Sequence, residues 1–518
     1  MPTGSAAESE LHDRRLEAEL RRHFGFESFR RGQRPVIEAL LAGRSAAAVF
    51  PTGGGKSLCY QLPALLLDGL TVVVSPLLAL MKDQVDALVA RGLPAARLDS
   101  SLTADEVRAV RERLRAGSLR LLYVSPERFA NERFRSLLEH LSVALFAVDE
   151  AHCISEWGHN FRPDYLKLPR TARALGAERV LALTATATPD VLEDICRSFE
   201  IAPGDAVRTG VYRPNLSLRT TPVARGARDA ALLEHVAQRP PGAGIVYVTL
   251  QKTAERVADL LRAARHEAMA YHAGLDAETR SRIQDEFLAS DRALVVATIA
   301  FGMGIDKPNI RSVDHYDLPK SLENWSQEIG RAGRDGEPAI CRVFGSIDDL
   351  VTLSNFAYGD TPSREAVRSL LDEVLSRNAE QALALVSLSR RVDIRPLVLR
   401  TLLTYLELDG VLEIGTPRYA TYRFRPLASS AEILARFDGA RRELLRGIFR
   451  RARKARTWFD LDLETVASEL DQPRERIVGA LDHLAERQLF ELRATDLRQI
   501  VRRRGPVDDL EWLADSLH

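Results

Sequence analysis

The feature that most constrains how this chain folds is a repeated alternation of short apolar runs with amphipathic stretches of helical period. The first set of runs is AAAVF, TVVVS, LRLLYVS, VALFAVD and VLALTAT, at residues 46–50, 71–75, 119–125, 143–149 and 180–186. A passage punctuated by glycine and proline follows at 202–225, and a second set is GIVYVT, EAMAYH, RALVVAT, IRSVDHY and AICRVFG, at 244–249, 267–272, 292–298, 310–316 and 339–345. Strands that alternate with helices favour a parallel sheet. The sequence therefore predicts two α/β lobes in tandem.

Beyond residue 345 the pattern becomes mainly helical, with short β segments. A helix over residues 395–410 and a hairpin over 411–426 follow the order of a winged-helix module, and a helix-turn-helix pattern occupies about 455–504. A chain of 518 residues is long enough for roughly three or four domains. The expected domains are a first lobe at 1–205, a second lobe at 206–345, a helical linker with a winged-helix-like domain at 346–430, and a basic helix with a second helix-turn-helix or winged-helix-like domain at 431–518.

Net charge gives no indication of a partner, because Lys+Arg and Asp+Glu are both 72. A surface for nucleic acid would have to come from local clustering of cations. The N-terminus is polar, and the weakly charged stretch at residues 62–81 is interrupted by Pro63, Asp68, Gly69, Ser75 and Pro76. We therefore expect no signal peptide and no membrane contact, and a cytoplasmic protein that is nucleoid-associated if it is bacterial.

The four cysteines, Cys59, Cys153, Cys196 and Cys341, lie far apart, and the sequence has no C-x-x-C pair. This spacing predicts neither a zinc knuckle nor a redox motif. Scattered free thiols are typical of a reducing compartment, and packing in the core is their expected role.

The first motif with a defined chemistry is PTGGGKS at residues 51–57, directly after the run AAAVF. Glycines leave backbone N–H groups free to point at phosphates, a lysine reaches the outer phosphates, and a hydroxyl binds Mg²⁺. Phe50 stands where the broader G-x-x-x-x-G-K-[ST] pattern has a glycine, and a glycine-rich turn with a surface lysine is the alternative. The residues expected to bind ATP here are Thr52, Gly53, Gly54, Gly55, Lys56 and Ser57.

A second motif, DEAH at residues 149–152, ends the apolar run VALFAV. Carboxylates at the C-terminal edge of a parallel sheet face the crevice in which ligands bind. Asp149 is expected to hold Mg²⁺ with Ser57, and Glu150 to orient or deprotonate the attacking water, as phosphoryl transfer requires. A capped helix start after a strand is the structural alternative.

A third motif, QEIGRAGRDG at residues 327–336, places Arg331 and Arg334 three residues apart. On one helix face of the second lobe, these guanidiniums would reach the γ-phosphate when the lobes close and neutralise transition-state charge. Gln327, one turn earlier, would help to place the water. Read alone, the string also fits a solvated basic helix.

Together these motifs resemble those of the RecQ family of DNA helicases in superfamily 2, over about residues 10–345. The segment FGFESFRRGQ at 24–33 is similar to the family's adenine-recognition segment, which implies that Phe26, Arg30 and Gln33 contact ATP. The other matching segments are VVVSPLLALMKDQV, TATAT and ATIAFGMGIDKPNI, at 72–85, 184–188 and 297–310. The resemblance implies an α/β fold of two RecA-like parallel-sheet lobes, followed here by a mainly helical C-terminal region.

The segment CISEWGHNFRPDY at residues 153–165 resembles the aromatic-rich loop with which the family couples single-stranded DNA to ATP hydrolysis. Trp157, Phe161 and Tyr165 offer flat rings for bases, and His159 and Arg162 are polar neighbours. A spacing of four also fits a buried helical stripe. The DNA contacts that the resemblance favours are Trp157, His159, Phe161 and Arg162.

The chain departs from the family in one respect, because many members carry a four-cysteine zinc module after the second lobe. Cys341 is the only cysteine beyond the first lobe, so no structural zinc is expected. The segment at 441–456 is strongly basic and can follow a phosphate backbone or form a solvated helix face. Tyr419 and Arg423, with Arg418 and Tyr422, can stack at a duplex end and wedge the strands, although ordinary sheet packing is the preferred reading.

The sequence therefore predicts an ATP-dependent helicase that translocates on single-stranded DNA and unwinds forked duplex DNA in recombination and repair. The resemblance implies 3′ to 5′ polarity. The alternatives are a DNA-stimulated translocase that remodels protein–DNA complexes with little unwinding, an RNA helicase, and a DNA-binding module with an inactive motor.

Overall fold

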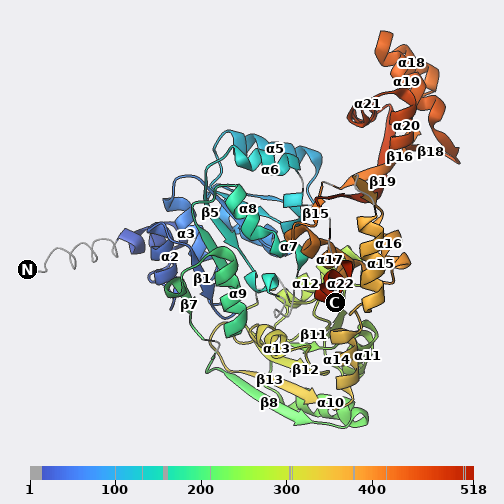
Figure 1. Ribbon diagram of the computed structural model, residues 1–518. Coiled ribbons are helices and arrows are strands. Elements are labelled where there is room, and N and C mark those ends of the chain that lie inside the picture. Colours follow the sequence, from blue (N-terminus) through green and yellow to red (C-terminus); the bar gives the residue numbers. More distant parts are fainter. Residues whose placement is uncertain are drawn as a thin grey trace, which may run out of the picture. The chain divides into compact units, whose positions relative to one another are not determined.

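The computed structural model describes residues 15–99, 101–130, 132–155, 162–210, 212–302, 305, 307–376, 380–415, 417–505, 507 and 509–518. Two compact units make up the chain. The first comprises residues 1–129 and 133–359, and the second comprises 130–132 and 360–518. The first unit contains two parallel sheets, and the second contains an antiparallel sheet (Figure 1).

The first lobe is built on a seven-stranded parallel sheet. In spatial order its strands are β3 (Ala95–Leu98), β4 (Leu121–Val124), β2 (Leu70–Val74), β5 (Val143–Val148), β6 (Val180–Thr184), β1 (Ala46–Val49) and β7 (Ala206–Arg208). Val72 and Val74 belong to one hydrophobic core, whereas Val73 belongs to another on the opposite face. Because both faces are buried, the inner strands read as continuous apolar runs.

Helices surround this sheet. They are α2 (Gln33–Leu41), α3 (Leu58–Leu66), α4 (Leu78–Ala90), α5 (Ala104–Arg115), α6 (Glu132–Glu139), α7 (Pro163–Leu166), α8 (Leu168–Ala174) and α9 (Pro189–Phe199). Helix α3 starts directly after PTGGGKS, and α9 starts after the TATAT segment with Thr188 as its N-cap. The motif segments thus lie at strand-to-helix connections.

The second lobe is built on a six-stranded parallel sheet. Its strands, in spatial order, are β10 (Ala268–Tyr271), β11 (Leu294–Ala297), β9 (Ala243–Tyr247), β12 (Ile310–His315), β13 (Ala339–Gly345) and β8 (Leu216–Pro222). Its helices are α10 (Arg228–Gln238), α11 (Gln251–Ala263), α12 (Ala277–Ala289), α13 (Leu322–Ile329) and α14 (Asp349–Tyr358). The prediction of two α/β lobes with parallel sheets is confirmed.

The second unit combines helices with an antiparallel sheet. In chain order its elements are α15 (Arg364–Leu375), β14 (Gln381–Leu383), α16 (Leu385–Arg391), α17 (Pro396–Leu408), β15 (Leu412–Ile414), β16 (Arg418–Pro426), α18 (Ser430–Ala435), α19 (Gly439–Arg451), β17 (Arg453–Ala455), β18 (Trp458–Asp462), α20 (Leu463–Leu470), α21 (Arg474–Glu486), β19 (Phe490–Arg503) and α22 (Leu510–Leu517).

The hairpin predicted at residues 411–426 is wrong. Strands β15 and β16 instead follow one another along the same partner, β19: Ile414 pairs with Val501, and Arg418 pairs with Arg498. The register shifts by one residue between these two pairs, and both strands run antiparallel to β19, so they are not the two arms of a hairpin.

Two hydrophobic cores in this unit are nested in sequence. The first combines α15, α16 and α17 with Val501 and α22, and the second combines α18 to α21 with Phe424 and Phe490. The polypeptide passes from the first core to the second along β16 and returns along β19. The sequence predicts two consecutive modules that meet at residue 430. In the structure one module is instead inserted within the other. Among the described residues, no helix is both long enough and apolar enough to cross a bilayer.

Candidate functional site

The glycine-rich segment joins β1 to α3 and holds a backbone that only glycine adopts easily. Gly53 and Gly55 have φ values of 80° and 78°, in the left-handed region. A Cβ on Gly55 would lie 2.4 Å from Gln33 Nε2. Lys56 Nζ donates to Phe50 O at 3.3 Å. The loop is therefore folded into a tight cradle at the C-terminal end of β1, the arrangement in which backbone N–H groups bind phosphates.

The segment before α2 is fastened to this cradle by side chains. Gln33 is buried, accepts a hydrogen bond from Arg30 N at 2.7 Å and donates one to Gly55 O at 2.8 Å. Arg30 Nη1 donates to Gly53 O at 2.5 Å. Phe26 is 49% exposed. Gln33 and Arg30 thus lie at the loop, as expected from the sequence, while the Phe26 ring is open to solvent.

Asp149 and Glu150 follow β5 and lie beside Lys56. Asp149 N donates to Val74 O at 2.8 Å, and Glu150 has a left-handed φ of 52°. Burial raises the pKa of both carboxyl groups, the charge of Glu150 raises that of Asp149 further, and Lys56 opposes both shifts. Burial also lowers the pKa of Lys56, against the opposing charges of Glu150 and Asp149. The lysine and the two carboxylates therefore form one electrostatic cluster.

This cluster fits a divalent cation. The two carboxylates are half-buried neighbours in the sequence, and the buried Glu150 Oε2 atom has no hydrogen-bond partner within the described part of the chain. Two neighbouring buried carboxylates are costly without a cation. Mg²⁺ usually takes one or two protein ligands and completes its shell with water and phosphate oxygens. Asp149 and the Ser57 hydroxyl are the groups that would hold it.

His152 connects the carboxylate motif to the TATAT segment. His152 Nδ1 lies 2.8 Å from Thr184 Oγ1, which donates to Thr186 O at 3.0 Å. Burial, followed by the charges of Lys56 and Arg162, lowers the pKa of His152 to about 4. The imidazole is therefore neutral at pH 7.

The predicted arginines of the second lobe face this cluster, but not from a helix. Helix α13 ends at Ile329, and Arg331 and Arg334 lie in the turns that follow. The prediction that they share a helix face is wrong, because the chain turns at Gly330 and at Gly333, where φ is 54°. Buried Arg331 donates through Nη1 to Gly302 O, and its charge lowers the pKa of Glu150.

Arg334 of the second lobe approaches the glycine-rich loop at residues 52–57, the expected phosphate loop. A Cβ on Gly53 would lie 3.8 Å from Arg334 Cγ, and a Cβ on Gly330 would lie 3.0 Å from Thr52 Cβ. The charge of Arg334 also lowers the pKa of Lys56. Both arginines are thus within electrostatic reach of the groups expected to bind the triphosphate.

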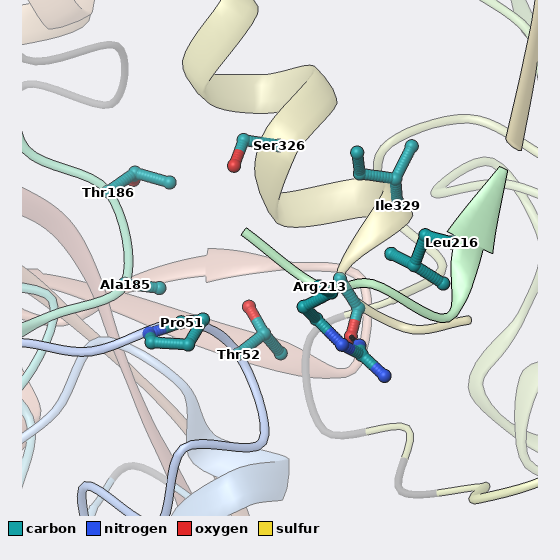
Figure 2. Close-up of a pocket in the computed structure, with 9 residues that line it drawn as sticks. Pro51, Thr52, Ala185, Thr186, Arg213, Leu216, Ser326 and Ile329 are labelled. Carbon is teal, nitrogen blue, oxygen red and sulfur yellow. Dashed lines mark hydrogen bonds between the residues drawn. The ribbon is translucent and has the colours of Figure 1, made fainter. Parts of the chain in front are cut away.

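A cavity between the lobes lies at this contact. Figure 2 shows Pro51, Thr52, Ala185 and Thr186 of the first lobe opposite Ser326, Ile329, Arg213 and Leu216 of the second. Arg213 Nη1 donates to Gly330 O at 3.1 Å and Arg213 Nη2 to Gly333 O, so it braces the turn that carries Arg331 and Arg334. Gln327, next to Ser326 on α13, is half-buried.

Sequence reasoning missed Arg213 and Gly302. Both support an arginine turn more than 25 residues away along the chain. Arg213 belongs to no segment singled out in the sequence, and Gly302 lies in the segment at 297–310, for which no role of this glycine was predicted. The repeated threonines of TATAT were the available signal for Thr184 and Thr186, whose link to His152 was also not foreseen.

Of the aromatic-rich segment at 153–165, the structure describes residues 153–155 and 162–165. Trp157, His159 and Phe161 lie outside the described residues. Arg162 is half-buried at the start of α7, and its charge lowers the pKa of Glu150. Tyr165 is fully buried and donates from its hydroxyl to Asp149 O at 2.9 Å. The expectation that Tyr165 presents a face to bases is therefore wrong, because its ring belongs to the core.

The two predicted C-terminal DNA contacts lie on β16 in the second unit. Tyr419 is 40% exposed and packs edge-on against Tyr422, with ring centroids 6.4 Å apart. Arg423 Nε donates to Asp460 Oδ1 at 2.6 Å. Both are accessible to a ligand, and Arg423 already has an acidic partner.

Comparison with known families agrees with the two-lobe architecture. The DEAD/DEAH box helicase family model matches residues 30–195, and the helicase conserved C-terminal domain model matches residues 227–336. The two matches fall on the first and the second lobe.

Curated relatives extend the likeness. The chain is 43% identical over 340 residues to "ATP-dependent DNA helicase RecQ" of Bacillus subtilis, covering 65% of this chain and 57% of that protein. It is 40% identical over 369 residues to "Probable ATP-dependent DNA helicase RecS" of the same organism, covering 71% and 74%. It is 37% identical over 507 residues to "ATP-dependent DNA helicase Q-like 5" of Arabidopsis thaliana, covering 94% and 54%. The chain spans about half the length of most of these relatives.

Solved structures share the fold at low identity. The structure of Mycobacterium smegmatis helicase Lhr bound to ssDNA and AMP-PNP has a TM-score of 0.52 and 21% identity, over 73% of this chain and 55% of that one. The structure of S. cerevisiae Dbp5 bound to RNA and ADP BeF3 has a TM-score of 0.52 and 17% identity, over 66% and 90%.

Proposed function

Because this chain belongs to the RecQ family of superfamily 2 helicases, we propose that it is an ATP-dependent DNA helicase. It translocates 3′ to 5′ on single-stranded DNA and unwinds forked or tailed duplexes in recombination and repair. We place it in the cytoplasm, on the nucleoid if the source is bacterial, and without structural zinc, since Cys341 is the only cysteine after residue 196.

One observation carries this proposal: cations of the second lobe meet the phosphate loop and carboxylates of the first. Arg334 lies against Gly53, and Arg331 acts on Glu150. A nucleotide bound at Lys56 would therefore be contacted from both sides. Its cleavage removes the group that the arginines bind, and this weakens the contact between the lobes.

The residues divide the chemistry as follows. The loop from Thr52 to Ser57 binds the phosphates, and Asp149 and the Ser57 hydroxyl would hold Mg²⁺, which would supply positive charge beside them. Glu150 orients the attacking water and accepts its proton, with Gln327 assisting. Arg331 and Arg334 stabilise the negative charge that develops in the transition state.

The remaining groups act on the base and on DNA. Gln33 and Arg30 orient the adenine through a segment that is already tied to the loop, and Phe26 covers the base. Trp157, His159, Phe161 and Arg162 contact the single strand. Arg162 lies close enough to Glu150 for its charge to lower the pKa of that carboxylate. Contact of DNA with Arg162 would therefore change the electrostatic environment of Glu150.

The test is unwinding of forked, 3′-tailed and 5′-tailed duplexes with and without ATP. The proposal expects ATP-dependent release from forked and 3′-tailed substrates and little from 5′-tailed ones. ATP hydrolysis stimulated by single-stranded DNA without strand release supports the translocase instead. Stronger stimulation by RNA than by DNA contradicts the assignment of the substrate.

A further inference from the structure

The sheet of the nested module in the second unit has one covered face and one open face. Phe424, Leu461 and Phe490 are almost fully buried against helices α18 to α21. Since side chains alternate along a strand, Arg423 and Arg425 of β16 point to the opposite face. Figure 1 shows α18, α19, α20 and α21 gathered around β16 and β18.

A row of charged residues crosses this open face on four neighbouring strands. Arg453 of β17 pairs with Asp460 of β18, Asp460 pairs with Arg423 of β16, and Arg423 pairs with Arg493 of β19. Directly opposed like charges destabilise a sheet. Arg423 is compensated by Asp460 at 2.6 Å. Within the described residues, Arg453 and Arg493 have no carboxylate partner.

An indole ring holds two of the guanidiniums on this face. The Trp458 ring centroid lies 4.6 Å from the guanidinium carbon of Arg493 and 5.7 Å from that of Arg425. Arg425 also pairs with Glu491. Because the two guanidiniums lie over the Trp458 ring, a ligand on this face would meet cations and not an open aromatic ring.

The edge of the sheet adds further positive charge. Strand β17 is the edge strand, and the segment RRARKARTW at residues 450–458 has five basic residues and no acidic one. Arg451 pairs with Glu469 at 2.6 Å. Arg450, Lys454 and Arg456 are exposed, and among the residues that the structure describes no carboxylate pairs with them. Cations therefore outnumber carboxylates around Trp458, although the whole chain is neutral.

We propose that this surface, the arginine face (Arg423, Arg425, Arg453, Trp458 and Arg493, with Arg450, Lys454 and Arg456 at its edge), binds the phosphate backbone of duplex DNA. Unpaired bases bind to open aromatic rings, whereas a duplex presents one phosphate charge per about 1.7 Å of axis. A row of guanidiniums across a sheet, of which Arg423, Arg425 and Arg493 are held by side-chain contacts, suits the duplex. This proposal rests on the proposed function only for the identity of the ligand, DNA. Binding to the arginine face requires no ATP.

The test measures binding of the full chain to a short blunt duplex and to a single strand, without nucleotide, at several salt concentrations. The variants are Arg453→Glu and Arg493→Glu, with neutral Arg453→Gln as a milder change. The matched control is Arg436→Glu, which reverses an exposed charge at the end of α18 in the same module. ATP hydrolysis stimulated by single-stranded DNA reports separately on the motor.

Each charge reversal is expected to weaken duplex binding about tenfold and to reduce the slope of log K against log salt by about 1 or more. Arg453→Gln is expected to lower the affinity less, and Arg436→Glu to leave it unchanged. Hydrolysis should persist in all of them. Duplex affinity that survives both reversals, or a loss confined to the single strand, overturns the proposal. Absence of ATP hydrolysis by the wild-type protein overturns the proposed function. The duplex-binding measurements still test the arginine face in that case, because they require no ATP.

Discussion

His152 Nδ1 lies 2.8 Å from Thr184 Oγ1, and that hydroxyl also donates to Thr186 O. The imidazole belongs to the segment that carries Asp149 and Glu150, whereas Thr186 lines the cavity between the lobes. A single threonine hydroxyl thus joins the segment of Asp149 and Glu150 to the surface that the second lobe contacts.

Thr184→Val should break this link while keeping the shape of the side chain. We expect kcat for ATP to fall several-fold with little change in KM, and unfolding free energy to fall by about 1–3 kcal/mol, because His152 loses a buried partner. Thr71→Val is the control: Thr71 is fully buried, and its hydroxyl has no hydrogen bond within the described residues. Equal kinetics in the two variants would contradict the role of the link.

Arg334→Ala should remove a cation that reaches the phosphate loop. We expect kcat to fall by about 10³–10⁵-fold, the range for loss of an arginine that stabilises phosphoryl transfer, with smaller effects on DNA binding. Arg292→Ala, at an exposed position of the same lobe, should leave kcat unchanged. Steady-state hydrolysis with saturating single-stranded DNA measures both, and a loss below tenfold in Arg334→Ala would contradict direct contact with the phosphates.

Stability should depend on pH through His152. Its pKa is lowered from 6.5 in the unfolded chain to about 4 in the folded one. Below pH 6.5 the unfolded state therefore binds more protons, so stability is full above that pH and falls as the pH drops toward 4. The contribution lost between pH 7 and pH 5 is about 2 kcal/mol. Urea unfolding of His152→Asn should show a pH dependence smaller by about that amount; identical pH dependence in the two proteins would contradict a buried neutral imidazole.

The inner strands could be predicted from sequence because both of their faces are buried. All ten apolar runs are strands, whereas β3, β7 and β8 were missed. Each of the three lies at the edge of its sheet. Strand β8 is largely exposed, and β3 contains Arg97. An edge strand needs no continuous apolar run, so pattern reasoning misses such strands unless, like the edge strand β10, they carry an apolar run.

Residues of the candidate site could be singled out from the sequence where phosphoryl-transfer chemistry requires particular residue types. They could not where tertiary packing determines the position of a side chain or strand. The phosphate loop, the carboxylates and the arginines each have a recognisable local pattern. The burial of Tyr165 depends on its hydrogen bond to Asp149 O, and the bracing of the arginine turn depends on Arg213. The pairing of β15 and β16 with the distant β19 likewise depends on contacts that no local pattern encodes.

The most direct test of the central claim is ATP hydrolysis by the purified chain and by Lys56→Ala, each with magnesium and with or without single-stranded DNA. A nucleotide held between the lobes at Lys56 predicts hydrolysis by the wild-type protein that DNA stimulates. It also predicts near-complete loss in Lys56→Ala, with DNA binding retained. Hydrolysis at the wild-type rate in Lys56→Ala, or none in the wild-type protein, would contradict the assignment of this cleft.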